Sequence, residues 1–186
     1  MSFEQYWYTL NKKNDELNKV LSSYWNHYSS ITSWQFWMIL ALTLIPLIIL
    51  FLKIDRKRIF ELLFFGYTAH ILWTYYNIAL EKYGYLNHPY FLTPALPYAL
   101  TLTASMLPVT FILLYQFCTN HSANYYLYTL FVSAIFAFIL GPLEGHFKFA
   151  VLRNGMNSFV IFFSDILIAY LSYWFTKIML KLRGKE

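Results

Sequence analysis

The sequence has few charged residues for its length. Only 12% of its 186 residues are charged and 59% are hydrophobic, whereas a soluble domain usually carries about 25% charged residues. The deficit extends along the whole chain, and polar stretches that could cover a soluble core are short. We therefore expect lipid to surround most of the chain, which forms one membrane domain.

Cysteine and recognisable catalytic motifs are also scarce. The single cysteine, Cys118, excludes an internal disulfide, a CxxC redox pair and a cysteine-rich metal site. The motifs HExxH and GxSxG, the P-loop and the glycine-rich dinucleotide turn are absent. The first thirty residues lack the apolar core and cleavage site of a signal peptide. No catalytic residue, metal site or cofactor is predicted, which weighs against an enzyme without excluding one.

Aromatic and basic residues are abundant. Aromatic residues make up 22% of the chain, and the formal net charge is +5. Tyrosine and tryptophan favour the bilayer interfaces, where an apolar ring lies beside a hydrated polar tip. The basic residues cluster at predicted helix ends, so the membrane surface accounts for them better than nucleic acid does, and no nucleic-acid partner is expected.

The N-terminal segment, residues 1–31, is predicted to be an amphipathic helix outside the bilayer core. Its apolar residues alternate at spacings of three and four over residues 3–28, which keeps them on one helical face. The helix could lie in the membrane interface, anchored by Tyr6, Trp7 and Tyr8. It could instead form a short coiled coil whose register Asn14 sets. The short length and the aromatic content favour the interface.

The remainder, residues 32–186, is predicted to be a multi-pass transmembrane domain. The fold class is therefore all-α, a membrane bundle of about five helices, expected at residues 33–52, 59–80, 98–118, 125–140 and 157–180. Pro108 should kink the third helix, and Gly141-Pro142 should interrupt or end the fourth. Residues 143–156 should be irregular or form a short interfacial helix. Four spans would follow if the fourth segment only dips into the membrane.

Charge predicts the orientation in the cell membrane. The run from Lys53 to Arg58 is basic, and short basic loops stay in the cytoplasm. Five spans with the N-terminus outside place this run and the C-terminal tail inside together, with eight basic residues inside and six outside. We therefore expect the N-terminus outside and the C-terminus in the cytoplasm.

Candidate ligand-binding residues are the polar side chains inside the predicted helices. In the second helix one stripe carries His70, Thr74 and Asn77, with Tyr67 and Glu81 at its ends. Such a stripe should face other helices or a hydrated cavity, because exposing it to lipid is costly.

Two further acidic residues are candidates. Asp165 lies near the centre of the last helix, where a charge is most costly. Glu61 lies on the opposite side of its helix from His70 and could pair with Lys57 or Arg58 at the interface. The stretch Glu144 to Lys148, with His146, is interpreted most simply as a solvated loop.

These residues support several functions. His70, Asn77 and Asp165 could form a cluster that only holds helices together. They could line a cavity for a small hydrophobic molecule, lipid, ion or proton, or form an enzyme site. Our leading hypothesis is a non-enzymatic membrane protein that binds a partner protein, a second copy of itself or a small hydrophobic ligand. The alternatives are a small transporter or proton-coupled carrier component using Asp165 and His70, and a membrane-embedded enzyme.

Several motifs of residues 54–180 carry a resemblance to a known group of proteins. They are the basic run into Glu61, Tyr83-Gly84-Tyr85 with His88-Pro89, Pro94 with Pro97, and Leu107-Pro108-Val109 followed by Leu114-Tyr115-Gln116. In these features the chain resembles an uncharacterised family of small multi-pass membrane proteins from endospore-forming Firmicutes. The resemblance implies a multi-pass membrane fold and adds no site residues, because the family has no established activity. Members often carry an acidic residue near position 77, where this chain has Asn77.

Overall fold

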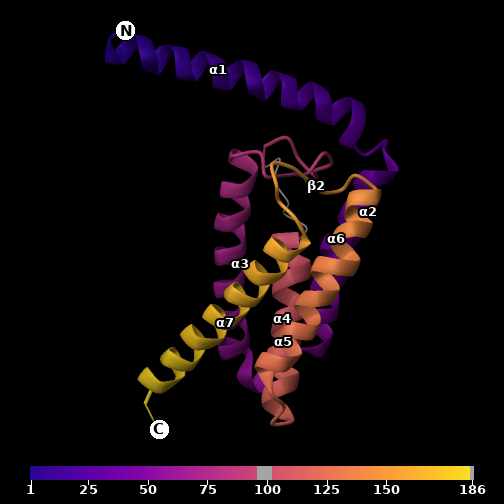
Figure 1. Cartoon of the computed structure of the whole chain (residues 1–186), viewed down its shortest axis with the longest axis vertical. Helices are drawn as coiled ribbons and strands as arrows, with labels where there is room; N and C mark the ends of the chain where they lie inside the picture. Colours follow the sequence, from indigo (N-terminus) through magenta and orange to yellow (C-terminus); the bar gives the residue numbers. More distant parts are fainter. Residues whose placement is uncertain (96–101, 185–186) are drawn as a thin grey trace.

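The computed structural model describes residues 1–95 and 102–184, and it is helical through most of that range. Helices α2, α3, α4, α5 with α6, and α7 form a bundle, and α1 crosses one end of it (Figure 1). The principal helices are α1 (Phe3–Tyr24), α2 (Trp34–Lys53), α3 (Ile59–Lys82), α4 (Leu107–Asn120), α5 (Tyr125–Ile135), α6 (Gly141–His146) and α7 (Ser158–Leu182). The all-α prediction is confirmed.

Three helices are long and apolar enough to cross a membrane within the described residues. They are α2, α7 and the continuous helix Tyr125–His146, which joins α5 to α6. In α2 only Ile39 is buried, so its apolar surface suits contact with lipid rather than with water. The chain is therefore treated as an integral membrane protein.

The predicted helix boundaries agree closely with α1, α2, α3 and α7, and α1, α2 and α7 each begin at a side-chain cap. Ser2 forms a capping box with Gln5, Ser33 accepts a hydrogen bond from the Phe36 N–H, and Asn157 accepts from the first turn of α7. Between α2 and α3 the basic run forms the short 3₁₀ helix η2 (Arg56–Arg58). The predicted start of the third helix, residues 98–101, lies outside the described residues, as does the end of the basic tail, residues 185–186.

The prolines act differently from the prediction. Both Pro108 and Pro142 lie in the first turn of an α-helix, directly after a π-helical segment, η3 (Leu102–Met106) and η4 (Phe136–Leu140) respectively. A proline lacks the N–H that would bond to the preceding turn, and a wider π turn accommodates that loss. Of the two outcomes predicted at Gly141-Pro142, the fourth helix does not end there, since it continues to His146. Its α-helical geometry is instead interrupted by η4, directly before Gly141.

The N-terminal helix continues through the π-helical segment η1 (Trp25–Ser29) and is fastened to the loop after α3. The Ser29 hydroxyl donates to the Phe91 carbonyl over 2.9 Å and accepts from the Phe91 N–H over 2.8 Å. The Trp25 indole N–H also donates to that carbonyl, over 3.2 Å. Helix α1 itself buries no residue, so only its C-terminal end is attached to the bundle.

The core of the bundle lies where α3 packs against both α4 and α7. Phe65 of α3 stacks on Tyr115 of α4 with ring centroids 4.8 Å apart. Gly66 lets the same two helices approach closely, because a Cβ there would lie 2.6 Å from Cγ1 of Ile112. These contacts hold α3 as the central helix of the bundle.

Two short strands close the end of the bundle near the N-terminus. β1 (Leu86–Asn87) follows α3 and β2 (Val151–Leu152) follows α6, and they pair antiparallel, with Leu86 opposite Leu152. The sequence analysis did not predict this pairing, because two-residue strands carry no periodic pattern. The paired loops form a cap over the space between α3, α6 and α7 (Figure 1).

Candidate functional site

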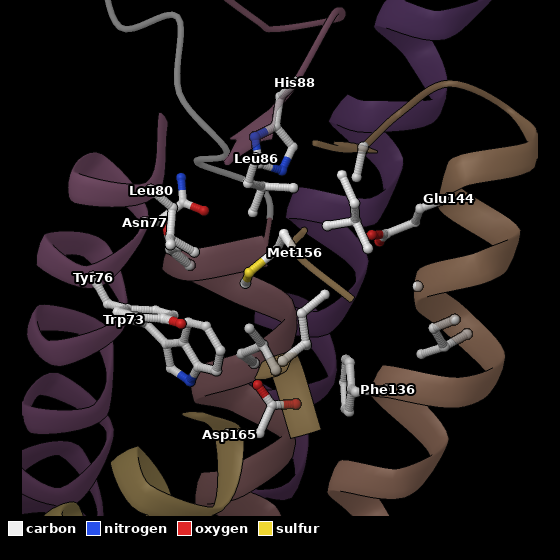
Figure 2. A pocket seen from close by; sticks show the side chains of 17 residues that line it. Trp73, Tyr76, Asn77, Leu80, Leu86, His88, Phe136, Glu144, Met156 and Asp165 are labelled. Carbon is white, nitrogen blue, oxygen red and sulfur yellow. The ribbon is translucent and has the colours of Figure 1, made fainter. Parts of the chain in front are cut away.

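A partly enclosed cavity lies under the β1–β2 cap. Its volume is about 70 Å³, and the atom-free space including the mouth is about 670 Å³. A cavity of that inner volume holds on the order of five water molecules. Its walls come from α3, η3, α4, η4, α6 and α7, and Leu86, His88 and Leu152 contribute from the cap (Figure 2).

Most of the lining is apolar, but a few polar groups face the interior. Those on the helices are Trp73, Asn77, Thr103, Glu144 and Asp165. No lysine or arginine is among the described residues that line the cavity. The cavity is therefore rich in groups that accept hydrogen bonds and lacks a permanent positive charge to balance its carboxyls.

Asp165 is the most unusual of these groups. The residue is 1% exposed, and neither carboxyl oxygen has a hydrogen-bond partner among the described residues. It lies on the buried face of α7 with Ile168, Ala169 and Ser172, as helical spacing of three and four residues requires. A buried carboxyl without a partner carries the full cost of desolvation, so its presence calls for a ligand, water or a proton.

His88 reaches the cavity from the cap and is held by an acidic side chain. Its Nδ1 lies 2.6 Å from Oε1 of Glu81, and the amide of Asn77 donates to the same oxygen over 2.9 Å. Since a carboxylate only accepts, Nδ1 carries the proton, and the other ring nitrogen of a neutral His88 is an acceptor. That nitrogen, Nε2, is buried and has no partner. In Figure 2 His88 and Asp165 lie at opposite ends of the view, with Met156 between them.

Glu144 brings a second carboxyl to the cavity. It projects from α6, and its carboxyl points inward (Figure 2). It is close enough to Asp165 for the two groups to repel one another when both are ionised. The interpretation of Glu144 as part of a solvated loop is therefore wrong, because the fourth helix extends past Pro142 and carries Glu144 on its inner face.

Only two of the five predicted site residues line the cavity. Asn77 and Asp165 both line the cavity. His70 donates from Nδ1 to the Thr103 carbonyl over 2.8 Å, and the Thr74 hydroxyl lies 3.3 Å from the same nitrogen. His70 thereby connects α3 to η3, and neither His70 nor Thr74 lines the cavity. The structure thus does not form the predicted cluster of His70, Asn77 and Asp165.

Glu61 lies at the other end of α3, near the basic run. Its carboxylate forms the predicted ion pair with Arg58, 2.5 Å from Nη2, and accepts a hydrogen bond from the Tyr115 hydroxyl. The pairing is confirmed, and it places Glu61 away from the cavity.

Sequence reasoning missed His88, Glu144 and Trp73 as lining residues. His88 follows a two-residue strand, and its position depends on a pairing with residues more than sixty positions away. Trp73 contributes an indole N–H that is buried without a partner. For His88, the only signal in the sequence was the dipeptide His88-Pro89 in a predicted loop.

The arrangement supports binding of a small group that donates hydrogen bonds. No group of three or more histidine, cysteine, aspartate or glutamate side chains in the described part of the chain is arranged to hold a metal ion. The molecule is thus a helical membrane protein with an acid-lined internal cavity. Comparison with protein-family models, with curated proteins and with solved structures finds no match for this chain. The resemblance to the Firmicutes family stays a prediction.

Proposed function

We propose that this chain is a non-enzymatic, multi-pass membrane protein that binds a small, mainly apolar ligand through a cationic or hydrogen-bond-donating group. The observation that carries the proposal is Asp165, whose two carboxyl oxygens are buried without a partner at the cavity wall. Ligand sites in proteins are mostly apolar with a few convergent polar groups. This cavity has that composition.

The remaining polar groups of the cavity support a ligand of that kind. His88 Nε2 is also buried without a partner, and it accepts a hydrogen bond when the imidazole is neutral. Glu144 is a further carboxyl facing the same space. Two carboxyls that share a site repel one another unless a proton or a cation lies between them. A positively charged donor would relieve that repulsion and satisfy the acceptors together.

The proposal includes five membrane spans. Besides the three apolar helices, α3 has 24 residues, which corresponds to about 36 Å of helix and exceeds the thickness of the hydrocarbon core. It runs beside α4 and α7 in the same bundle (Figure 1). The helix formed by η3 and α4 supplies the fifth span. The polar residues of α3, among them His70 and Glu61, bond to neighbouring elements and need not face lipid.

The proposal also includes an orientation in the membrane. Five spans place the N-terminus and the β1–β2 cap on one side, and η2 with the end of α7 on the other. Eight of the basic residues belong to the latter side, which we assign to the cytoplasm. The cavity therefore lies towards the outer side of the cell membrane.

The N-terminal segment, residues 1–31, is assigned to the outer membrane interface. Helix α1 crosses the end of the bundle instead of continuing α2 (Figure 1). Its exposed aromatic residues, which include Phe3, Trp7 and Tyr8, suit the headgroup region. The same surface could also bind a protein partner or a second copy of the chain, and this stays a prediction.

Native mass spectrometry of the purified protein tests the ligand proposal. Wild type should retain a small molecule that Asp165→Asn loses. Glu61→Gln is the matched control, because it makes the same acid-to-amide change away from the cavity and should keep the ligand. If wild type carries no small molecule and Asp165→Asn only lowers the melting temperature, Asp165 serves the packing of the helices and the proposal is wrong.

A proton-coupled carrier component is the second candidate. Three titratable side chains, Asp165, Glu144 and His88, line one cavity, and acidic chains of this kind occur in proton pathways. The pair Asp165 and His70 that the sequence suggested does not meet, so any such pathway uses His88 or Glu144 in its place. Proton uptake by proteoliposomes that Asp165→Asn abolishes would favour this candidate over simple binding.

A further inference from the structure

An apolar groove lies beside the acid-lined cavity, between α2 and α6. Its volume is about 210 Å³, and its lining comprises Trp34, Met38, Leu42, Met106, Leu140, Leu143, Glu144, Phe147 and Phe149. Glu144 is the one charged side chain in this lining. The groove is therefore an apolar channel with a single acidic group.

The groove and the cavity share two residues. Leu140 and Glu144 line both of them. These residues are four positions apart and lie on one face of the helix that joins η4 to α6. Both spaces therefore border this helix, and Glu144 contributes to the lining of each.

Aromatic rings border the groove where α2 begins. Trp34 meets Phe149 edge to face with centroids 5.7 Å apart, and meets Phe147 in the same manner at 6.5 Å. Such pairs stabilise a defined arrangement of rings, and a tryptophan at the start of a membrane helix marks the level of the interface. The groove thus runs from the interface along the apolar part of α2.

We propose that the ligand is a single-chain amphiphile whose alkyl chain lies in the groove and whose ammonium head lies between Glu144 and Asp165. This inference rests on the proposed ligand binding and adds the chemical class of the ligand. The charges specify the head, because the described cavity lining has two carboxyls and neither lysine nor arginine. The apolar lining of the groove specifies the alkyl chain of the ligand. Because Glu144 lines both the groove and the cavity, the alkyl chain and the ammonium head belong to one molecule.

The ammonium head has the donors that this cavity requires. A primary ammonium carries three N–H donors. Asp165 offers two oxygens without partners, and the Glu144 carboxyl faces the same cavity. Charge-assisted hydrogen bonds of this kind are about twice as strong as neutral ones. A fatty acid of the same length would place a third carboxylate against the first two and is excluded.

The test compares butylamine with dodecylamine in nanodiscs of neutral lipid. Occupancy is measured by native mass spectrometry at equal amine concentration in the lipid phase. The variants are Asp165→Asn, Met38→Trp, which fills the groove, and Ile45→Trp as the matched control. Ile45 is an exposed residue of α2 that does not line the groove. Circular dichroism confirms that each variant is folded.

We expect Met38→Trp to lower the affinity for dodecylamine at least tenfold and to leave that for butylamine unchanged. Ile45→Trp should change neither, and Asp165→Asn should weaken both. If Asp165→Asn weakens both amines while Met38→Trp weakens neither, the cavity binds amines without the groove and the inference is overturned, whereas the proposed function stands. If dodecanoic acid binds as well as dodecylamine, the inference that the ligand has an ammonium head is overturned. If Asp165→Asn changes no binding, the proposed function and the inference both fail.

Discussion

Arg58 and Glu61 form a two-pronged ion pair at the start of α3. The guanidinium donates from Nε to Oε2 over 3.1 Å and from Nη2 to Oε1 over 2.5 Å. Its remaining nitrogen, Nη1, donates to Thr119 and Asn120 at the end of α4. The hydrogen bond to Glu61 raises the pKa of Arg58, so the guanidinium is charged at every physiological pH. The pair joins the basic loop to two helices.

Replacing Glu61 should destabilise the end of the bundle where η2 lies. The side chains of Arg58 and Glu61 are only 26% and 15% exposed, and a hydrogen bond to a charged group contributes about 2 kcal/mol. Glu61→Gln should therefore lower the melting temperature in detergent. The control is Glu16→Gln, because the Lys13–Glu16 pair has the same i,i+3 spacing but is 71% and 49% exposed and contributes little. Equal melting temperatures for both variants would contradict this account.

Adding a methyl group at Gly66 should separate α3 from α4. A Cβ there would overlap the side chain of Ile112, and overpacking of a core costs about 1–3 kcal/mol. Gly66→Ala should therefore unfold at lower temperature than wild type. Gly145→Ala is the matched control, since its nearest contact would be an ordinary 3.9 Å to the Ala150 carbonyl. A Gly66→Ala protein as stable as Gly145→Ala would show that the two helices are not closely packed.

Removing the Ser29 hydroxyl should loosen the attachment of the N-terminal helix. Ser29 both donates to and accepts from the backbone of Phe91, and it is fully buried. Loss of about 1.4 kcal/mol of hydrogen bonding corresponds to a tenfold change in a local opening equilibrium. Ser29→Ala should thus exchange amide hydrogens about tenfold faster around Phe91, measured by mass spectrometry. The exposed Ser22→Ala should leave that rate unchanged, and an unchanged rate in Ser29→Ala would refute the anchor.

Single cysteines on a Cys118→Ala background should report the orientation. A membrane-impermeant maleimide should label Lys12→Cys and Arg153→Cys in intact cells, because both lie on the side assigned to the exterior. His121→Cys, in the turn between α4 and α5, should react only after lysis. The parent without cysteine gives the background signal. Labelling of Lys12→Cys only after lysis would place the N-terminus inside and overturn the orientation.

Local features of the sequence predicted the helices well. The ends of α2 and α7 follow from hydropathy and from the caps Ser33 and Asn157, which act on the next three residues. The Arg58–Glu61 pair was equally accessible, because residues three apart on a helix are neighbours whatever the fold. The continuation of the fourth helix past Pro142 was less predictable, because a π-helical turn ahead of a proline depends on how the neighbouring helices pack.

The candidate site was only half predictable. The deep position of Asp165 marked it as costly, and the polar stripe marked Asn77. His70 belonged to the same stripe, yet it bonds to the Thr103 carbonyl and stays out of the cavity lining. Helical periodicity tells which residues share a face but not which neighbouring backbone that face meets.

By itself the sequence determined that this chain enters a membrane, where most of its helices lie, and that Asp165 is the costliest charge, because hydropathy, capping and spacing act over a few residues. Only the tertiary structure decided that Asp165, Glu144 and His88 share one cavity and that an apolar groove adjoins it. These residues come from α7, α6 and the β1–β2 cap. Their meeting depends on contacts between segments far apart in the chain, which no local pattern encodes.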